Sequence, residues 1–272
     1  MSILNAIILG IVQGLTEFLP VSSSGHLVLL QKIFGITEPA LFFDTMLHTG
    51  TLLAVFIVLW KDIWGILKKI IQPVTLYLIL ATIPAVIAAL VFDDTIEHIF
   101  ESGNYLGLCF LLTSALLVSS EILSRHAAVN NSQKKAGDMN WLDALIIGVM
   151  QAVAIAPGIS RSGATISGAL FRRLDRDFAA RFSFLLSIPA ILGAVVLQTK
   201  TLVTAETAAA GAENISAAAI IAGTISAAIV GFFAVKLMLK IIKERSLFGF
   251  AVYTGVLGIL ILIDQFAVHL VF

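Results

Sequence analysis

Charged residues are scarce in this sequence. Asp, Glu, Lys and Arg make up 12% of its 272 residues and hydrophobic residues 59%, whereas an ordinary soluble domain has about 25% charged residues. The formal net charge is zero, so no basic excess indicates a nucleic-acid partner. This composition excludes an ordinary soluble globular domain and favours a chain that lies in lipid.

Cysteine is also nearly absent. The single cysteine, Cys109, excludes an internal disulfide, and its place in an apolar run predicts a packing role. No pair of cysteines or histidines has metal-site spacing, and no glycine-rich nucleotide-binding loop occurs. Met1–Gly10 has no basic residue, so we expect no cleaved signal peptide.

Long apolar runs dominate instead. A helix needs about 20 mostly apolar residues to cross the hydrocarbon core of a bilayer. Six such runs, separated by short loops, predict six transmembrane helices: Leu41–Trp60, Val74–Phe92, Tyr105–Leu123, Phe178–Leu197, Ile215–Leu239 and Leu247–Ala267. We therefore expect an all-α polytopic membrane protein with a single membrane domain over residues 1–272.

Two further apolar segments, Ile3–Leu30 and Trp141–Leu170, are interrupted in the middle. The breaks at 17–26 and 157–163 are rich in proline, glycine and serine, which end helices. Irregular backbone at membrane depth is tolerated only inside protein or against a water-filled cavity. Each segment therefore predicts a re-entrant helix–loop–helix hairpin.

The two interrupted segments resemble each other. At a shift of 138 residues Leu4–Gln13 aligns with Leu142–Gln151, and the Ser-x-Ser-Gly of Ser22–Gly25 aligns with that of Ser160–Gly163. Leucine, isoleucine and alanine match easily by chance in apolar runs, but glycine, glutamine and serine at one offset do not. We therefore predict an internal repeat.

The repeat halves cover about 1–123 and 141–272, joined by a linker over about 124–140. Three spans per half is an odd number, so the second half is predicted to be inverted. With the N-terminus outside, fourteen Lys and Arg residues fall on the inner side and two on the outer side. The positive-inside rule therefore predicts both termini outside and the linker inside.

Inversion would bring the two broken tips together near the middle of the bilayer, where inverted-repeat membrane proteins place their sites. The polar residues so gathered are Gln13, Glu17, Ser22, Ser23, Ser24 and His26 from the first tip, and Ser160, Arg161, Ser162 and Thr165 from the second.

The second tip has the residues of a phosphate site. The planar guanidinium of Arg161 suits a bidentate phosphate contact. Gly158 and Gly163 leave backbone N–H groups accessible, and the following helix start favours an anion. Further hydroxyl donors come from Ser160, Ser162 and Thr165.

The first tip carries a carboxylate, hydroxyls and an imidazole, which suit nucleophilic or general acid–base catalysis. Gln13 and Glu17 are four residues apart and share one helix face. Their oxygens could hold Mg²⁺ or Ca²⁺, shared with substrate phosphates.

Structural roles compete with these assignments. An Arg161–Glu17 pair and His26 could each be purely structural. Asp44 and His48, also four residues apart, could belong to the site or simply bond each other. Two carboxylates near the inner face, those of Glu121 and Asp143, are expected to be solvated.

The segment Gln13–His26 resembles the (Glu/Gln)-x-x-x-Glu motif and its continuation in bacterial undecaprenyl-diphosphate phosphatases, the bacitracin resistance protein family. Pro157–Thr165 is similar to the second motif of that family, Pro-Gly-x-Ser-Arg-Ser-x-x-Thr. The resemblance covers essentially the whole chain. Because the first motif position is Gln13 here, one carboxylate rather than two would serve a cation.

The resemblance implies hydrolysis of undecaprenyl diphosphate to undecaprenyl phosphate and inorganic phosphate. That reaction recycles the lipid carrier of cell-wall synthesis and is linked to bacitracin resistance. Similar enzymes lie in the bacterial inner membrane, open to the outer side and need a divalent cation. We expect the same location, opening and cation requirement here, with a polyprenyl diphosphate lipid as substrate. Whether the protein forms a homodimer is left open.

In the resulting mechanistic hypothesis, Arg161 and its neighbouring hydroxyls grip the diphosphate, Ser23 attacks the terminal phosphorus, and Glu17 or His26 transfers the proton. Two alternatives to Ser23 as the nucleophile, His26 and a metal-bound water, are left open. A lipid-phosphate flippase or anion carrier is the alternative, because broken helices are typical of secondary transporters. A structural scaffold of a cell-wall complex is a third interpretation, and no specific feature of the sequence supports it.

Overall fold

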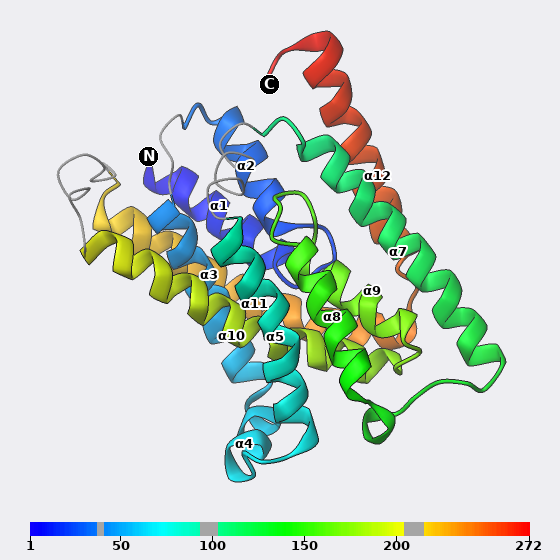
Figure 1. Ribbon diagram of the computed structural model, residues 1–272. Helices are drawn as coiled ribbons and strands as arrows, with labels where there is room; N and C mark the ends of the chain where they lie inside the picture. Colours follow the sequence, from blue (N-terminus) through cyan, green and yellow to red (C-terminus); the bar gives the residue numbers. More distant parts are fainter. Residues whose placement is uncertain (37–40, 93–102, 204–214) are drawn as a thin grey trace.

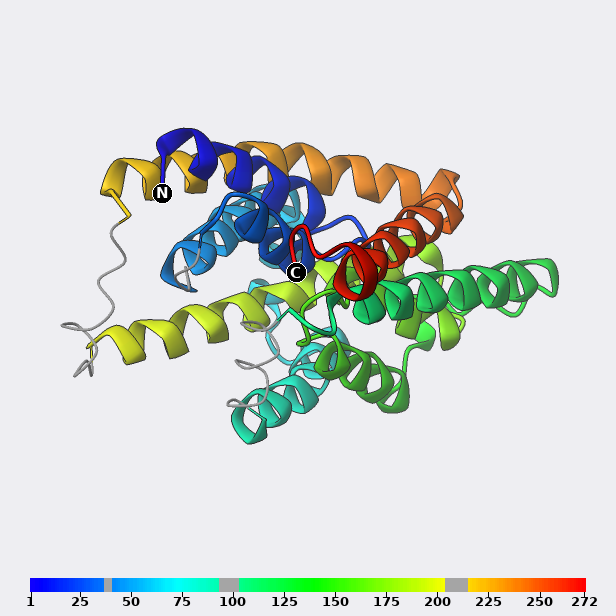
Figure 2. The ribbon, with the colours of Figure 1, turned by 90° about the horizontal axis from the view of Figure 1, so that it is seen from above.

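The computed structural model describes residues 1–36, 41–92, 103–203 and 215–272. Over these ranges the ordered elements are helices, and no strand occurs beyond an isolated bridge between Lys134 and Leu174. The helices pack side by side as a bundle (Figures 1 and 2). The predicted all-α fold is confirmed.

The helices follow the predicted segments closely. The part before the linker forms α1 (Ile3–Thr16), α2 (Ser23–Ile33), α3 (Leu41–Val58), α4 (Trp60–Lys68), α5 (Pro73–Val91) and α7 (Leu106–Val129). The short 3₁₀ turn η1 (Ala136–Asp138) lies in the linker. The rest forms α8 (Trp141–Val153), α9 (Arg161–Phe171), α10 (Arg176–Val203), α11 (Ala217–Glu244), α12 (Phe248–Ile263) and the π-helical turn η3 (Asp264–Val268).

Five of the described helices are long and apolar enough to cross a membrane: Pro73–Val91, Leu106–Val129, Arg176–Val196, Ala217–Glu244 and Phe248–Val268. They correspond to five of the six predicted spans, so the protein is a polytopic membrane protein. The sixth prediction, Leu41–Trp60, coincides with α3. This helix is followed after one residue by α4 at a bend of 76°, and the two make a sixth span only if they are counted together.

Both predicted interruptions occur. α1 ends at Thr16 and α2 begins at Ser23, while α8 ends at Val153 and α9 begins at Arg161. The aligned serines explain where the second helix of each pair begins. The Ser22 hydroxyl accepts from the backbone N–H of Gly25, and the Ser160 hydroxyl accepts from that of Gly163, as N-cap residues do.

Two close helix crossings hold the interrupted segments in the bundle. α1 packs along α11, as Figure 2 also shows, and α8 packs along α5. At the first crossing a Cβ on Gly10 would overlap the backbone oxygen of Gly223, and at the second a Cβ on Gly148 would overlap that of Ala81. Small residues at these positions let the backbones touch.

We predict that Gly148→Ala lowers the stability of the protein by about 1–3 kcal/mol, because the added methyl must push α8 away from α5. The matched control is Gly249→Ala in α12, where a Cβ meets nothing within 4 Å. Removing a helical glycine there should stabilise by about 0.5–1 kcal/mol. Thermal unfolding in detergent measures both. Equal shifts for the two variants would contradict the tight crossing.

Two buried carboxylates tie the helices together near the linker. Asp143 accepts hydrogen bonds from Lys134 Nζ at 2.9 and 3.0 Å and from Arg172 Nε at 2.6 Å. Glu121 accepts from Arg176 Nη1 at 2.8 Å and from the backbone N–H of Leu247 at 3.1 Å. Both residues are at most 2% exposed, so the expectation that they are solvated is wrong. Their charges are buried because cationic partners converge on them.

Candidate active site

The two interrupted tips contact each other. Arg161 Nη2 pairs with Glu17 Oε1, and the Ser162 hydroxyl donates to the backbone oxygen of Leu19 at 3.0 Å. Gly163 lies so close to Pro20 that a Cβ would sit 3.3 Å from it. Residues 144 positions apart in the sequence are thus joined in one cluster.

The Glu17 carboxylate is the centre of this cluster. It stands at the end of α1 and is almost fully buried. While Oε1 binds Arg161, Oε2 accepts hydrogen bonds from Ser23 Oγ at 2.5 Å and from Gln13 Nε2 at 2.9 Å. His48 Nδ1 lies 3.3 Å from the same oxygen. A carboxylate this close to a serine hydroxyl can accept its proton.

Arg161 reaches this cluster from the first residue of α9, directly after the capping Ser160. Its side chain is 22% exposed and borders a cavity of about 90 Å³. That is room for about three water-sized groups. The other residues around the cavity are Thr45, His48, Ala190, Ile191 and Ala194. The cavity is therefore lined by one cationic side chain, that of Arg161, among small and mostly apolar residues. Such a cavity suits an anion.

The predicted phosphate-binding hydroxyls make protein contacts. Ser160 Oγ and Ser162 Oγ are 3.2 Å apart, and Ser160 Oγ also caps α9. Thr165 Oγ1 donates to the backbone oxygen of Arg161 at 2.8 Å and lies 2.5 Å from Ser183 Oγ. These contacts hold the first turn of α9, and with it Arg161. Direct phosphate binding by these hydroxyls stays a prediction.

The two glycines of the second tip shape its backbone. Gly158 has a positive φ of 92°, which suits a residue without a Cβ, and its carbonyl accepts from Thr113 Oγ1 at 3.0 Å. The N–H of Gly163 donates to Ser160 Oγ at 3.0 Å. An anion-binding role for the Gly163 N–H would therefore compete with this cap.

His26 belongs to a neighbouring cluster. Its Nδ1 lies 2.6 Å from the backbone oxygen of Ser22, and its Nε2 lies 2.7 Å from the hydroxyl of Tyr253. The ring stacks on Tyr253 and meets the edge of Phe110. Since a carbonyl only accepts, Nδ1 carries the proton of the neutral ring and Nε2 accepts from tyrosine. A catalytic role for His26 stays a prediction.

Tyr253 was not predicted from the sequence. It lies in the apolar span of α12, 227 residues from His26, and no local motif marks it. His48, whose assignment was left open, joins Gln13 and Glu17. Its neighbour on α3, Asp44, accepts a hydrogen bond from Gln31 Nε2 at 2.8 Å. The spacing of four residues was the one available signal for His48.

Gln13 is fully buried and turns its amide nitrogen toward Glu17 and His48. Its Oε1 has no hydrogen-bond partner within the part of the chain that the structure describes. Over the same residues no group of three or more His, Cys, Asp or Glu side chains is arranged to hold a metal ion.

An apolar helical bundle with a buried arginine–carboxylate–serine cluster between two broken helix pairs defines a polytopic membrane protein with a candidate anion site. The family model described as "Bacitracin resistance protein BacA" matches residues 6–260. The chain belongs to this family.

The curated relatives agree over their whole length. "Undecaprenyl-diphosphatase 4" of Bacillus thuringiensis subsp. konkukian is 49% identical, with 98% of each chain covered. "Undecaprenyl-diphosphatase" of Carboxydothermus hydrogenoformans is 46% identical, over 98% of this chain and 99% of the relative. The relative of that name from Methanosphaera stadtmanae is 42% identical, over 97% of this chain and 98% of its own.

Proposed function

We propose that this protein hydrolyses undecaprenyl diphosphate in the membrane to undecaprenyl phosphate and inorganic phosphate, and so recycles the lipid carrier of cell-wall synthesis. The observation that carries this proposal is the cluster in which Glu17 binds both Arg161 and Ser23. It combines an anion-binding cation, a nucleophile and its base. Membership of a family whose curated members are named undecaprenyl-diphosphatases supports the substrate.

In the proposed reaction Ser23 Oγ attacks the terminal phosphorus while its proton passes to Glu17 Oε2, 2.5 Å away. The new bond is Oγ–P, the bond to the bridging oxygen breaks, and undecaprenyl phosphate leaves. Arg161 stabilises the charge on the transferring phosphoryl group. Water then attacks the phosphoserine, Ser23 regains the proton from Glu17, and inorganic phosphate is released.

The remaining predicted residues have proposed roles around this reaction. Ser160, Ser162 and Thr165 hold the first turn of α9 and offer hydroxyls to the outer phosphate oxygens. The positive φ of Gly158 and the close approach of Gly163 to Pro20 let the second tip contact the first. For His26 we propose a second proton site, held by the Ser22 carbonyl and the Tyr253 hydroxyl.

We propose that a divalent cation, Mg²⁺ or Ca²⁺, takes part together with the substrate. Among the described residues Gln13 Oε1 is buried without a partner, and Glu17 lies one helical turn away. These two residues would hold the cation together with phosphate oxygens, and Glu17, whose oxygens accept from Arg161 and Ser23, would share its charge between these donors and the cation. When bound, the cation would neutralise part of the diphosphate charge. Removing it with a chelator should lower phosphate release, and adding Mg²⁺ or Ca²⁺ should restore it.

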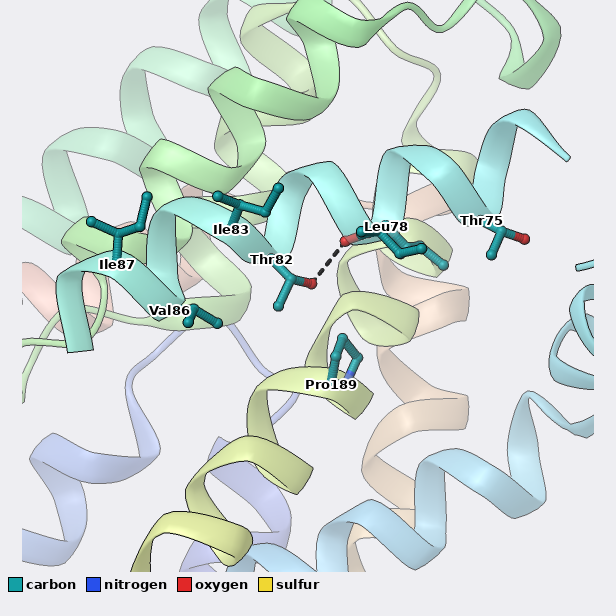
Figure 3. Close-up of a pocket in the computed structure, with 8 residues that line it drawn as sticks. Thr75, Leu78, Thr82, Ile83, Val86, Ile87 and Pro189 are labelled. Carbon is teal, nitrogen blue, oxygen red and sulfur yellow. Dashed lines mark hydrogen bonds between the residues drawn. The ribbon is translucent and has the colours of Figure 1, made fainter. Parts of the chain in front are cut away.

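An apolar groove beside the cavity is proposed to take part of the prenyl chain. It measures about 330 Å³ and lies between α5 and Pro189 of α10 (Figure 3). Its other lining residues are Thr75, Leu78, Ile79, Thr82, Ile83, Val86 and Ile87. Ala190 and Ile191, the next residues of α10, border the 90 Å³ cavity. One lipid could therefore place its diphosphate head in that cavity and its prenyl tail in the groove, on the two sides of this helix.

For the membrane arrangement we propose an inverted repeat with two re-entrant hairpins. The crossings of α1 with α11 and of α8 with α5 support it, because Gly10 and Gly148 occupy aligned positions. The termini lie toward the upper part of Figure 1 and the linker with α4 at the lower end. With the positive-inside rule, this supports termini and site opening on the outer side of the bacterial inner membrane.

The test is phosphate release from a long-chain polyprenyl diphosphate by the purified protein in detergent. Release that depends on added Mg²⁺ or Ca²⁺ is expected. No release by the wild-type protein under any metal condition would overturn the phosphatase proposal. Light scattering on the same preparation decides between a monomer and a homodimer.

A further inference from the structure

The amide of Gln13 bridges two residues of the site. Gln13 Nε2 lies 2.9 Å from Glu17 Oε2 and also 2.9 Å from His48 Nδ1. The nitrogen and oxygen of a side-chain amide are told apart by their hydrogen-bond partners, and for Gln13 the partner is the Glu17 carboxylate. The Glu17 carboxylate is paired with Arg161 and can only accept. The Gln13 atom that faces it must therefore be the NH₂ group.

This orientation fixes the proton on His48. An amide nitrogen has two N–H donors and no acceptor, so one N–H of Gln13 points to Glu17 and the other to His48 Nδ1. His48 Nδ1 is then an acceptor without a proton, and the proton of the ring lies on Nε2. A proton on Nδ1 would set two donors against each other at 2.9 Å. The other neighbour of Nδ1, Glu17 Oε2, is farther away at 3.3 Å and already accepts from Ser23 and Gln13.

The surroundings of His48 agree with a neutral ring that serves the cavity. Its side chain is 29% exposed and borders the 90 Å³ cavity together with Arg161. The charged residues facing it are Glu17 from α1, Arg161 from α9 and Asp44 on its own helix, while α10 contributes apolar residues. With Nδ1 bound to Gln13, Nε2 is the ring nitrogen offered to a molecule in the cavity.

We propose that His48 is a further substrate-binding residue, an uncharged Nε2–H donor whose tautomer is set by Gln13 and which hydrogen-bonds the diphosphate beside Arg161. The proposal rests on the proposed function for the identity of the anion. A neutral imidazole can stabilise developing negative charge as a hydrogen-bond donor without transferring a proton. It also adds a donor next to Glu17 without placing a second cation there.

His26 provides an internal reference, because its contacts require the opposite tautomer. Its Nδ1 donates to the Ser22 carbonyl and its Nε2 accepts from Tyr253. The experiment is ¹⁵N NMR of the full-length protein in detergent, with histidine labelled at both ring nitrogens. Signals of His48 and His26 are assigned by their loss in His48→Gln and His26→Gln. We expect protonated Nε2 and unprotonated Nδ1 for His48, and the reverse for His26. Protonated Nδ1 in His48 would overturn the proposal.

Two additions complete the NMR test. In Gln13→Glu a carboxylate replaces the amide donor, so the proton of His48 should move to Nδ1; an unchanged tautomer would overturn the role of Gln13. Methylenediphosphonate, a diphosphate analogue that phosphatases cannot split, should shift the Nε2 signal of His48 and leave the signals of His126, an exposed residue of α7 outside the site, in place. No shift of His48 at saturating analogue would overturn the contact.

Activity gives a separate measure. His48→Leu should lower kcat/KM for the polyprenyl diphosphate about 10- to 100-fold, as expected for one lost hydrogen bond to a charged group. His48→Gln keeps an N–H donor and should retain activity within a few-fold. Equal losses in both variants would contradict a donor role. Because the NMR arms need no turnover, they decide the proposal even if the phosphatase assay fails.

Discussion

Arg161→Ala is expected to lower kcat/KM for polyprenyl diphosphate by about 10³-fold or more. Arginines that stabilise the charge of a transferring phosphoryl group contribute effects of about this size. Among the described residues around the 90 Å³ cavity, Arg161 supplies the positive charge. Its removal therefore takes away both the attraction for the diphosphate and the stabilisation of the transition state. Phosphate release by the purified variant measures the effect.

The controls separate chemistry from folding. Arg161→Ala leaves Glu17 as a buried carboxylate without its counter-charge, which is destabilising in itself. Arg161→Lys keeps the charge but not the planar fork, and we expect an intermediate loss. Arg125→Ala is the matched surface control, because Arg125 is 57% exposed and pairs with Glu121 away from the site. If folded Arg161→Ala kept more than a tenth of wild-type activity, the proposed site would be wrong.

The span positions could be predicted from the sequence because lipid requires one property of a helix, sufficient apolar length. The breaks after Thr16 and Val153 could be predicted because proline, glycine and serine act locally on the backbone. The bend between α3 and α4 was not predicted, since the Leu59–Trp60 junction has no proline or glycine. It depends on how the end of α3 packs in the folded bundle.

The contact between the two interrupted segments was predicted from the alignment of their sequences. Bringing two aligned tips together was enough to pair Glu17 with Arg161. His48 and Tyr253 lie in apolar helices without a motif, and their partners come from α1 and α2. Such contacts depend on which helix packs beside which and on its rotation. The burial of Asp143 has the same origin, because Lys134 and Arg172 reach it from other segments.

Ser23→Ala is expected to reduce turnover by on the order of 10⁴-fold or more, the scale seen when a nucleophile that works with its base is removed. Ser23 is the serine whose hydroxyl lies 2.5 Å from Glu17 Oε2. Ser24, the next residue, instead lies 3.4 Å from Ser22 Oγ. Ser24→Ala is therefore the matched control and should cost less than tenfold. Both rates come from the phosphate-release assay.

A direct test uses the covalent intermediate. If Ser23 attacks phosphorus, acid quenching of a single turnover with substrate labelled at the terminal phosphate should leave label on the protein, and peptide mapping should place it on Ser23. Glu17 must pass the proton back to Oγ during hydrolysis, so Glu17→Gln should slow both steps. Because phosphohistidine hydrolyses in acid, a parallel sample is quenched in alkaline denaturant, and label found there on His26 would move the nucleophile to that residue. Turnover without protein-bound label after either quench would favour direct attack by water and would assign Ser23 a binding role.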